Sequence, residues 1–546
     1  SGLTEQPLFL GSLTVAIDGF LTIPAGLELV VEGTGKINIF GNLTAEGTAD
    51  KPITIVNKVE GPQKWYGLYF LEGSSGSLAH VSLSQAGFKD SNGRMAGIDI
   101  QSPNVTIANS TIDVPRYASY YSDSYTVGIY ATEDFTLTDS FVSAFNYGIY
   151  VGPNAHIMMK GNRVSGATYG VGLAGSGNFN NNLFENTSYP IWSPADMLSA
   201  STFSGNMFAG TSRPGVATFG IISGNHVWPV SLTEQPLYIN GGFAISADGS
   251  LRMPAGLELV VEGAKSINVS GNLTAEGTAE KPITFRNMVE GPQKWYGLNF
   301  LEGSSGSLTY VSLSQAGLKD SNNRMAGIDI QSPNVTIANS TINVPRNGTS
   351  SSDSYTIGIY AAADFTLTDS NVSAFNRGIY VEPSAHVTMM GNLVSEANFG
   401  VYLLGSGDFN NNLFENTQYP ISISLDDLPS STFVGNEFID NSWNGIWLTG
   451  HTISETSIWP ENLSSQPLFI HNSVTITDYA SLEIQPGTEI RFVGDYGMIF
   501  NNANLIALGT ITQPITFTSP LEEPASWLGL YLGTNSFADL NNVTVS

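Results

Sequence analysis

The feature of this sequence that most constrains its fold is a long internal repeat. The segment MAGIDIQSPNVTIANSTI occurs at residues 95–112 and again at 325–342. The offset is about 230 residues, and a more diverged partial third copy begins near Leu463. Such repeats are typical of stacked architectures, in which each unit buries its apolar face against the next. We therefore expect copy one at residues 1–231, copy two at 232–462 and a partial third copy at 463–546, all in one continuous solenoid.

A shorter period lies inside the long repeat. In copy one the segments YTVGIY, NYGIYV, TYGVGL and SYPIW centre on Gly128, Gly148, Gly170 and Pro190, in steps of about 20 to 22 residues. Runs such as FTLTDSFV and STFSGNMF lie between them and alternate apolar with polar residues, which is typical of short strands. The pattern predicts an all-β solenoid with about 20–25 residues per coil, folded as an elongated rod.

Asparagine and aspartate recur once per coil, two or three residues before an apolar residue. Stacked coils place equivalent side chains above one another, where Asn side chains can bond to their neighbours and tolerate a tight bend. We therefore predict a structural ladder, although Asn is also common in turns. Its members are Asn109, Asp139, Asn162, Asn182 and Asn206 in copy one, and Asn339, Asp369, Asn392, Asn412 and Asn436 in copy two.

The coil pattern resembles the right-handed parallel β-helix proteins of the pectate-lyase-like superfamily. The segments PAGLEL (24–29), GNLTAEGT (41–48), PIT (52–54) and WYGLYF (65–70) are similar to β-helix repeats in large bacterial and archaeal surface proteins. The resemblance covers nearly the whole chain and implies a right-handed parallel β-helix. It constrains function little, because this fold hosts lyases, hydrolases, adhesins and coat proteins.

Composition limits the partners and the location. Asp and Glu total 47 against 20 Lys and Arg, so the formal net charge is −27 and we expect neither nucleic acid nor polyanionic sugars as partners. The chain has no cysteine, which excludes disulfides and thiolate metal sites but is compatible with an extracellular or cell-surface solenoid. No apolar run approaches the roughly 20 residues that span a bilayer. The sequence ends at NNVTVS, partway through a repeat, and we expect coils beyond both ends.

No catalytic constellation stands out. Inverting glycosidases of this fold lead us to expect Asn-Thr-Asp, Asp-Asp and Gly-His-Gly motifs, but Asp426–Asp427 is the one adjacent acid pair of that type and copy one reads ADM there. Lyases of this fold use a basic residue, for which Arg116 and Arg346 in inter-coil loops are the best candidates. His156 and His386 are flanked by apolar residues, which favours strand filler over a base.

Metal binding and glycosylation have only weak candidates. Asp90 and Asp320 lie in the loops FKDSNGR and LKDSNNR, beside Asn. A calcium ion needs six or more oxygens, so a solvated turn is the simpler interpretation and we expect no cofactor. Among several Asn-x-Ser/Thr triplets, Asn347 in RNGTSSSDS is the best exposed candidate for a glycan.

The repeated segment VEGPQKWYGL (59–68 and 289–298) could be a binding site used twice or a repeated part of the scaffold. The third copy has LEEPASWLGL at 521–530, which keeps the Trp and loses the Lys and the Tyr. This favours a scaffold strand entry, with Trp65, Trp295 and Trp527 pointing outward or capping the turn.

Three hypotheses for function remain. The first is a non-catalytic structural or adhesive rod in a cell-surface, sheath or surface-layer protein, with copies of the same or a related surface protein as partners. The second is a carbohydrate-binding module that uses exposed aromatic residues, with Tyr120, Tyr121 and Tyr125 as candidates and cell-surface glycans as partners. The third is a polysaccharide lyase or hydrolase.

Overall fold

The computed structural model describes most of the chain as two compact units. The described residues are 6–61, 64–89, 95–114, 126–292, 294–319, 325–344, 355–374, 376–461, 463, 466–520 and 526–546. Unit 1 consists of Ser1–Ile222, His226–Phe243 and Leu257–Val260, and unit 2 of Ser223–Asn225, Ala244–Gly256 and Val261–Ser546.

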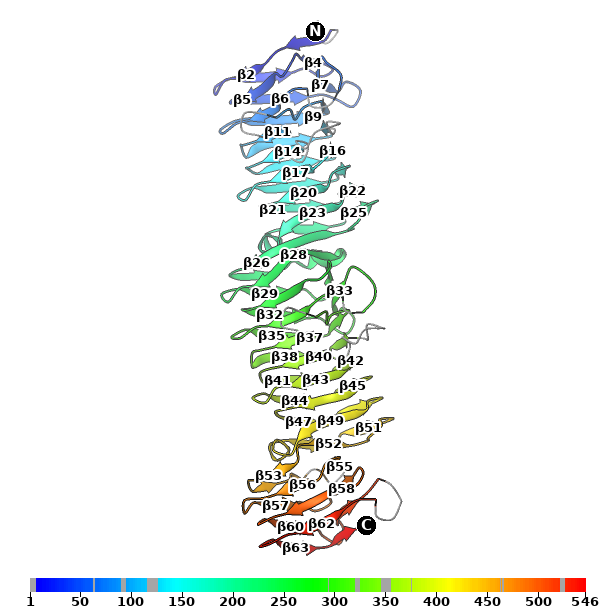
Figure 1. The fold of residues 1–546 in the computed structure, drawn as a ribbon. Coiled ribbons are helices and arrows are strands. Elements are labelled where there is room, and N and C mark those ends of the chain that lie inside the picture. Colours follow the sequence, from blue (N-terminus) through cyan, green and yellow to red (C-terminus); the bar gives the residue numbers. More distant parts are fainter. Residues whose placement is uncertain are drawn as a thin grey trace. The chain divides into compact units, whose positions relative to one another are not determined.

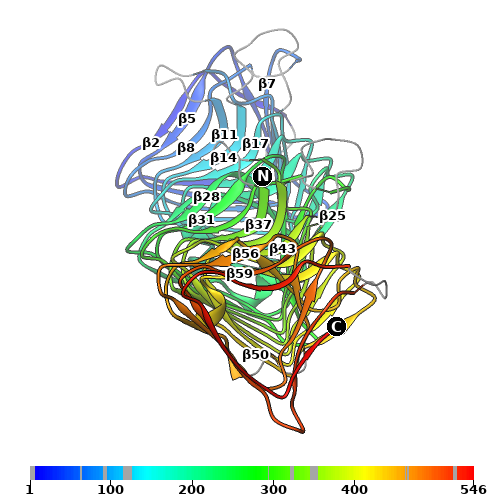
Figure 2. The same ribbon diagram turned by 60° about the horizontal axis from the view of Figure 1, so that its bottom comes forward.

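Unit 1 is built of short strands that stack in three parallel ladders, with one strand per coil in each ladder (Figures 1 and 2). The first ladder contains β1 (Leu8–Leu10), β4 (Glu28–Val31), β7 (Ile53–Asn57), β10 (Val81–Ser84), β13 (Thr111–Val114), β16 (Phe141–Ala144), β19 (Arg163–Ser165), β22 (Leu183–Glu185) and β25 (Met207–Ala209). The second contains β2 (Leu13–Val15), β5 (Lys36–Ile39), β8 (Gly67–Phe70), β11 (Met95–Ile100), β14 (Thr126–Ala131), β17 (Tyr147–Val151), β20 (Tyr169–Leu173), β23 (Tyr189–Pro194) and β26 (Val216–Ile222). The third contains β3 (Phe20–Ile23), β6 (Asn42–Glu46), β9 (Ser75–Ala79), β12 (Asn104–Ala108), β15 (Phe135–Thr138), β18 (His156–Lys160), β21 (Ser176–Asn180) and β24 (Thr202–Ser204).

Unit 2 repeats this arrangement (Figure 1). Its first ladder contains β33 (Ile283–Asn287), β36 (Val311–Ser314), β39 (Thr341–Val344), β42 (Asn371–Ala374), β45 (Leu393–Ser395), β48 (Leu413–Glu415) and β51 (Glu437–Ile439). The second contains β31 (Ser266–Val269), β34 (Gly297–Phe300), β37 (Met325–Ile330), β40 (Thr356–Ala361), β43 (Arg377–Val381), β46 (Phe399–Leu403), β49 (Tyr419–Ser424) and β52 (Ile446–Thr449). The third contains β29 (Ser250–Met253), β32 (Asn272–Glu276), β35 (Ser305–Thr309), β38 (Asn334–Ala338), β41 (Phe365–Thr368), β44 (His386–Met390), β47 (Ser406–Asn410) and β50 (Thr432–Val434).

The last coils of unit 2 carry the remaining strands. The second ladder continues through β55 (Leu468–Ile470), β58 (Glu489–Phe492), β61 (Ile515–Thr518) and β64 (Val543–Val545). Two further ladders contain β53 (Thr452–Ile453), β56 (Val474–Ile476), β59 (Gly497–Phe500) and β62 (Gly529–Leu532), and β54 (Ser457–Ile458), β57 (Ser481–Ile484), β60 (Asn504–Leu508) and β63 (Phe537–Asn541). The strands β27 (Asn225–Val227), β28 (Leu237–Ile245) and β30 (Glu258–Val261) include residues of both units.

Each unit is therefore a right-handed parallel β-helix, and the predicted fold class is confirmed. Coil length varies more than the sequence pattern suggests: Val164 pairs with Phe184, 20 residues on, whereas Ile112 pairs with Val142, 30 residues on. The described residues also form three short 3₁₀ helices, η3 (Asp196–Ala200), η4 (Val230–Glu234) and η6 (Leu428–Ser430). No helix in the described part of the chain has the length and apolar character needed to cross a membrane.

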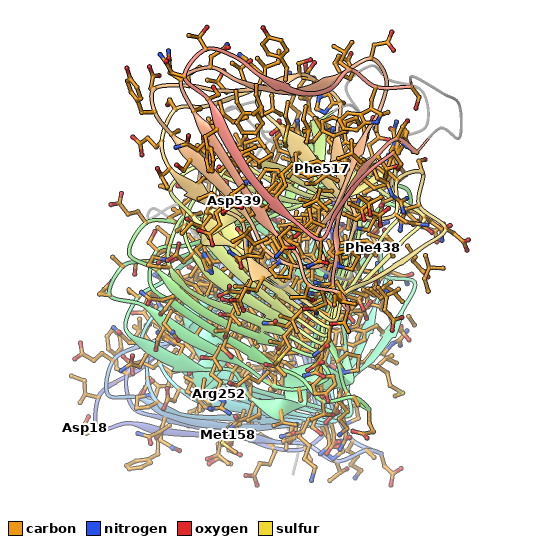
Figure 3. All side chains as sticks on the ribbon, turned by 90° about the horizontal axis from the view of Figure 1, so that it is seen from below. Asp18, Met158, Arg252, Phe438, Phe517 and Asp539 are labelled. Carbon is orange, nitrogen blue, oxygen red and sulfur yellow. The ribbon has the colours of Figure 1, made fainter. Side chains whose placement is uncertain are left out.

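Strand alternation decides what lies inside the coils. On β12 the side chains of Val105 and Ile107 are 1% exposed, whereas Asn104 and Thr106 face outward. Equivalent inward residues stack from coil to coil, as Phe179 does on Phe203 with ring centroids 5.5 Å apart. Side chains fill the interior and project outward around it (Figure 3). The apolar interior therefore extends along each unit as stacked rows of like side chains.

A buried polar ladder runs beside the apolar rows, but its register differs from the predicted one. Asn162 donates from Nδ2 to Asn182 Oδ1 at 3.0 Å, and Asn182 donates in the same way to Asn206 Oδ1 at 3.1 Å. In the preceding coils this place is taken by Ser110 and Ser140, since Ser140 N donates to Asn162 Oδ1 and Ser110 N to Ser140 Oγ.

Four predicted members of the ladder are therefore wrong by one residue. Asn109, Asp139, Asn339 and Asp369 are exposed and have φ values of 45° to 49°. They occupy the left-handed turn position that directly precedes the ladder, which Asn and Asp tolerate better than most side chains. In copy two the ladder runs through Ser340, Ser370, Asn392, Asn412 and Asn436.

We expect the Asn412→Ala variant to lower the free energy of unfolding by about 2–4 kcal/mol, because it leaves buried polar groups without partners. Asn412 is 1% exposed, accepts from the Asn392 side chain and donates to Asn436 Oδ1. Chemical denaturation of the two proteins measures the difference. The neighbouring Asn411→Gly variant is the control, because Asn411 is exposed with φ 52° and glycine accepts that conformation. Equal losses in both variants would contradict a structural ladder.

The repeated segment VEGPQKWYGL anchors one coil to the next. The indoles of Trp65 and Trp295 are 0% exposed, and each donates from Nε1 to a backbone carbonyl of the following coil, Ser84 at 2.9 Å and Ser314 at 2.8 Å. Trp527 makes the same bond to the Ser546 carbonyl at 2.7 Å. The predicted outward orientation is therefore wrong for Trp65 and Trp295. Their polar N–H finds a backbone acceptor, which allows the whole ring to be buried.

Candidate functional site

Several predicted site residues lie outside the described residues. These are Arg116 and Arg346, the calcium candidates Asp90 and Asp320, the glycosylation candidate Asn347, and Tyr120, Tyr121 and Tyr125. Tyr355, the copy-two counterpart of Tyr125, is described and is 62% exposed.

Aromatic side chains follow one another on the outer face of the second ladder of unit 1. Tyr130 on β14 stacks on Tyr150 on β17, with ring centroids 5.3 Å apart and an interplanar angle of 8°. Beside this pair, Tyr169 stacks between Tyr147 and Tyr189, at 4.8 Å and 5.3 Å. Tyr147 meets Tyr150 edge to face, which joins the two columns. We call this set, together with Trp192, the unit 1 stripe: Tyr130, Tyr147, Tyr150, Tyr169, Tyr189 and Trp192.

Unit 2 carries an equivalent set on the outer face of its second ladder. Tyr380 on β43 stacks between Tyr360 and Tyr402, with centroids 5.4 Å and 5.7 Å apart and interplanar angles of 7° and 5°. Phe399 meets Tyr402 edge to face and stacks on Tyr419 at 5.0 Å. The aromatic row continues to Trp443 and Trp447, whose centroids are 5.4 Å apart, and from Trp447 to His471 at 4.7 Å. The unit 2 stripe consists of Tyr360, Tyr380, Phe399, Tyr402, Tyr419, Trp443 and Trp447.

Strand register explains why the rings meet. In a parallel ladder without a shift, residues that pair across successive strands lie directly above one another. Tyr360, Tyr380 and Tyr402 are such partners. The outer face of the third ladder has no comparable aromatic row among the described residues. There the paired residues are small, polar or flexible, namely Ser77, Thr106, Thr136, Met158, Asn178 and Thr202. The stripes are thus a property of one face of each unit.

The stripes present ring edges and phenol hydroxyls, because the ring faces stack on one another. All the tyrosines of both stripes are half-buried. Burial raises the pKa of Tyr147, Tyr150, Tyr169 and Tyr380 above the ordinary phenol value, and a neighbouring tyrosine or glutamate raises it further. These hydroxyls therefore stay protonated at physiological pH and can both donate and accept hydrogen bonds. The result is a rigid surface that offers apolar edges and neutral polar groups together.

Arginines hold the columns in place. The Arg377 guanidinium lies over the rings of Tyr380 and Tyr402, 5.0 Å and 4.8 Å from their centroids. In unit 1 the guanidinium of Arg213 lies 4.2 Å from the centroid of Tyr189. Such contacts rigidify the rings. Tyr360 also donates its hydroxyl to Glu382 Oε1 at 2.6 Å. The stripes are therefore ordered before any ligand binds, which lowers the entropic cost of recognition.

A serine, a histidine and an aspartate meet on the third ladder of unit 2. His386 Nδ1 lies 2.8 Å from Ser406 Oγ, and its Nε2 lies 3.1 Å from Asp408 Oδ2. Partial burial raises the pKa of Asp408, but hydrogen bonds from Thr432 and His386 lower it more, so the net shift is downward. His156 and His386 thus lie half-buried on β18 and β44 and bond to side chains of neighbouring coils. Their assignment as strand filler in preference to a base stays a prediction.

The backbone amide beside the serine of this cluster already donates to a structural partner. A nucleophilic serine needs donors for the developing oxyanion. The amide of Gly407, next to Ser406, instead donates to Ser431 Oγ at 3.0 Å. Copy one keeps the His156–Ser176 contact at 2.8 Å but has Asn178 in place of the aspartate. The cluster is a hydrogen-bonded surface network.

The acid pair Asp426–Asp427 belongs to a local turn. Asp427 precedes η6, its amide donates to Ser424 Oγ at 3.1 Å, and Ser424 donates back to its carboxylate. Burial, together with the adjacent Asp426, raises the pKa of Asp427. A cavity of about 420 Å³ adjoins Asp426 and Glu455. Of this pair, Asp426 lines the cavity, whereas the carboxylate of Asp427 accepts a hydrogen bond within the turn.

A second cavity, of about 390 Å³, adjoins the unit 2 stripe at the turns that lead into β46, β49 and β52. Its lining includes Asn398 and Gln418, which directly precede the stripe residues Phe399 and Tyr419. The Gln418 amide donates to the Tyr419 hydroxyl at 3.3 Å. The cavity is thus joined to the stripe by a hydrogen bond.

The sequence contained a signal for the stripes that the repeat pattern masked. The segments YTVGIY and NYGIYV drew attention to their central glycines, whereas Tyr130 and Tyr150 flank those glycines at the same offset. An outward residue that recurs at the same distance from an aligned glycine must stack on its counterpart. Alignment of the coils on Gly128 and Gly148 would have revealed the column.

The family model described as "NosD: Periplasmic copper-binding protein (NosD)" matches residues 59–229 and 316–475, more than half of the chain. The chain belongs to the NosD family. No curated protein matches it.

Solved structures of phage tailspikes were also found for this NosD family chain. The Dettilon tailspike protein is 11% identical, over 78% of this chain and 61% of that one, with a TM-score of 0.16. A mutant of the tailspike protein of E. coli bacteriophage HK620, in complex with a pentasaccharide, is 12% identical over 95% of this chain and 73% of that one, with a TM-score of 0.17.

The copper in the NosD family description can be tested against the side chains present. Copper favours imidazole, thiolate and thioether ligands. The chain has no cysteine. The described residues contain no group of three or more His, Cys, Asp or Glu side chains that could hold a metal. Both ring nitrogens of His386 are engaged by Ser406 and Asp408. The described part of this NosD family member therefore offers no group of His, Cys, Asp or Glu side chains that fits a copper ion.

We expect the purified chain to retain no stoichiometric copper. The reason is that the described residues contain no group of three or more His, Cys, Asp or Glu side chains that could hold a metal ion. The protein is incubated with Cu(II), and with Cu(I) under reductant, passed over a desalting column and analysed by elemental mass spectrometry. A His156→Ala/His386→Ala variant serves as the control and should behave identically. One equivalent of copper that survives desalting, and is lost in this variant, would contradict the expectation.

Proposed function

We propose that this chain is a non-catalytic, extracellular β-helix module that binds glycans along its aromatic stripes and so has an adhesive or structural role at a cell surface. The single observation that carries the proposal is the row of stacked tyrosines on the outer face of one ladder in each unit.

The chemistry of the stripes suits a sugar chain. Apolar ring edges can contact the C–H groups of a pyranose, and neutral phenol hydroxyls can exchange hydrogen bonds with its hydroxyls. Tyrosine supplies a large rigid contact area with few rotatable bonds, so little entropy is lost on binding. The rings also repeat along the ladder at centroid distances of 5.4 Å and 5.7 Å in unit 2, which favours an extended ligand over a compact one.

The net charge of the chain limits which glycans we propose as ligands. The net charge of −27 opposes polyanions, and the described cations beside the stripes, Arg213 and Arg377, are already engaged with aromatic rings. An uncharged polysaccharide or oligosaccharide is therefore the ligand that we propose. The non-catalytic part of the proposal rests on the cluster at His386 and the turn at Asp427, whose polar groups are occupied by structural hydrogen bonds.

The test is a glycan array followed by a product assay on every glycan that binds. The proposal expects binding to uncharged glycans, with no release of reducing ends or of unsaturated products. Product release by the full chain would contradict the non-catalytic part. Absence of binding to any glycan on a broad array would contradict the whole proposal.

A further inference from the structure

The cavity beside the unit 2 stripe differs between the two copies of the repeat. It is lined by Glu396, Ala397, Asn398, Asn416, Thr417, Gln418, Asp440 and Ser442. Glu396, Asn416 and Asp440 come from three successive coils, and all three side chains are exposed. The lining of the cavity therefore places one carboxylate on each side of an amide, next to the aromatic rings of the unit 2 stripe.

The copy-one counterparts of the two acids are glycines. Gly166 and Gly210 stand where copy two has Glu396 and Asp440, while the middle residue is Asn in both copies. A Cβ atom built on Gly210 would lie 2.6 Å from Asn186 Oδ1, so the copy-one amide occupies the space that an acid would need. The aromatic neighbour differs as well, since Arg213 in copy one corresponds to Trp443 in copy two.

We propose that this cavity is a specificity subsite for one uncharged sugar residue of a glycan that lies on the unit 2 stripe. The inference rests on the proposed function and deepens it. Glu396 and Asp440 accept hydrogen bonds from hydroxyls of that sugar, and the Asn398 and Gln418 amides donate or accept beside them. Gln418 also fixes the hydroxyl of Tyr419, so the cavity and the stripe act on the same ligand.

The same carboxylates exclude acidic sugars. A uronic acid placed between Glu396 and Asp440 would bring a third carboxylate next to two others, and none of the described residues that line the cavity is basic. Repulsion of this kind is how a site rejects a competitor that is otherwise similar in shape. Copy one, with glycines and Arg213 in these places, lacks this filter.

Backbone conformation makes the acids easy to replace without harm to the fold. Glu396 has φ 60° and Asp440 φ 55°, close to the values of 76° for Gly166 and 60° for Gly210. Glutamate rarely adopts this left-handed conformation, whereas glycine adopts it without strain. The Glu396→Gly/Asp440→Gly variant should therefore melt at the same temperature as the parent or higher, so any change in binding is not a sign of misfolding.

The experiment is calorimetric titration of the full chain with an oligoglucose and with an oligoglucuronate of the same length and linkage. The parent should bind the oligoglucose at least about 10-fold more tightly. The Glu396→Gly/Asp440→Gly variant should lose about 10-fold in affinity for the oligoglucose, because two charge-assisted hydrogen bonds are gone. The Glu396→Gln/Asp440→Asn variant should keep most of that affinity and accept the oligoglucuronate, because hydrogen bonding remains while the charge is removed.

A control variant, Glu280→Gln/Glu290→Gln, also removes two negative charges, but at exposed positions away from the cavity. It should leave the affinities for both sugars unchanged. Equal affinity of the parent for both sugars, or unchanged selectivity in both cavity variants, would overturn the subsite while leaving the stripe as a glycan surface. Failure of the parent to bind either sugar although it binds other glycans on an array would overturn the proposed sugar class. Failure to bind any glycan would overturn the proposed function as well.

Discussion

The Tyr380→Ala/Tyr402→Ala variant is expected to lose glycan binding almost completely. These rings form the middle of the unit 2 stripe, stacked with centroids 5.7 Å apart. Aromatic anchors at the centre of a binding surface contribute most of its affinity, and loss of two should cost roughly 2–4 kcal/mol, or about 30- to 1,000-fold in Kd. Titration with a glycan identified on the array, before and after substitution, measures the loss.

The control for this variant must change the surface without touching the stripe. Met390→Ala is suitable, because Met390 is 48% exposed on the third ladder of the same unit. It should leave the Kd unchanged. The melting temperature of the double tyrosine variant is recorded as well, since the rings also support Arg377. Unchanged glycan affinity in a folded Tyr380→Ala/Tyr402→Ala protein would contradict the proposal that the stripe binds sugars.

The second substitution with a large expected effect acts on the stability of the fold. Trp65→Ala is expected to lower the free energy of unfolding by about 3–5 kcal/mol, the usual cost of removing a large aromatic side chain from a core. The indole is 0% exposed, and its Nε1 donates to the Ser84 carbonyl at 2.9 Å on the next coil. The substitution therefore opens a cavity and leaves the partly buried Ser84 carbonyl without this donor. Denaturant titration, followed by the fluorescence of the remaining tryptophans, measures the change.

Met158→Ala is the control for Trp65→Ala, because Met158 is 53% exposed on β18 of the same unit (Figure 3). It should change stability by less than about 0.5 kcal/mol, as surface substitutions usually do. A Trp65→Ala protein that keeps its stability but loses glycan binding would show that VEGPQKWYGL is a binding segment and not part of the scaffold.

The fold could be predicted from the sequence because its determinants are local and repeated. The glycines and proline at positions 128, 148, 170 and 190 do mark successive strands of one ladder, β14, β17, β20 and β23. The polar ladder was found in the right coils but one residue early at Asn109 and Asp139. In those coils Ser110 and Ser140 occupy the inward position of the ladder. A pattern based on Asn and Asp therefore indicated the residue directly before each serine.

The candidate site could be predicted only in part. The sequence indicated that aromatic residues could bind sugars, and it directed attention to loop tyrosines that lie outside the described residues. The stripes depend on which outward residues share a register across coils of unequal length. Tyr360 and Tyr380 are 20 residues apart, whereas Tyr380 and Tyr402 are 22 apart. A fixed period cannot place all three rings in one column, but strand pairing does.

A crystal structure of the full chain with a bound oligosaccharide from the array tests whether the stripes are glycan-binding surfaces. We expect sugar residues along the outer face of the second ladder of unit 2, in contact with Tyr360, Tyr380 and Tyr402. We also expect one sugar in the cavity between Glu396 and Asp440. An oligosaccharide bound to the third ladder, with the tyrosine rings left uncovered, would show that the stripes are not the glycan-binding surface.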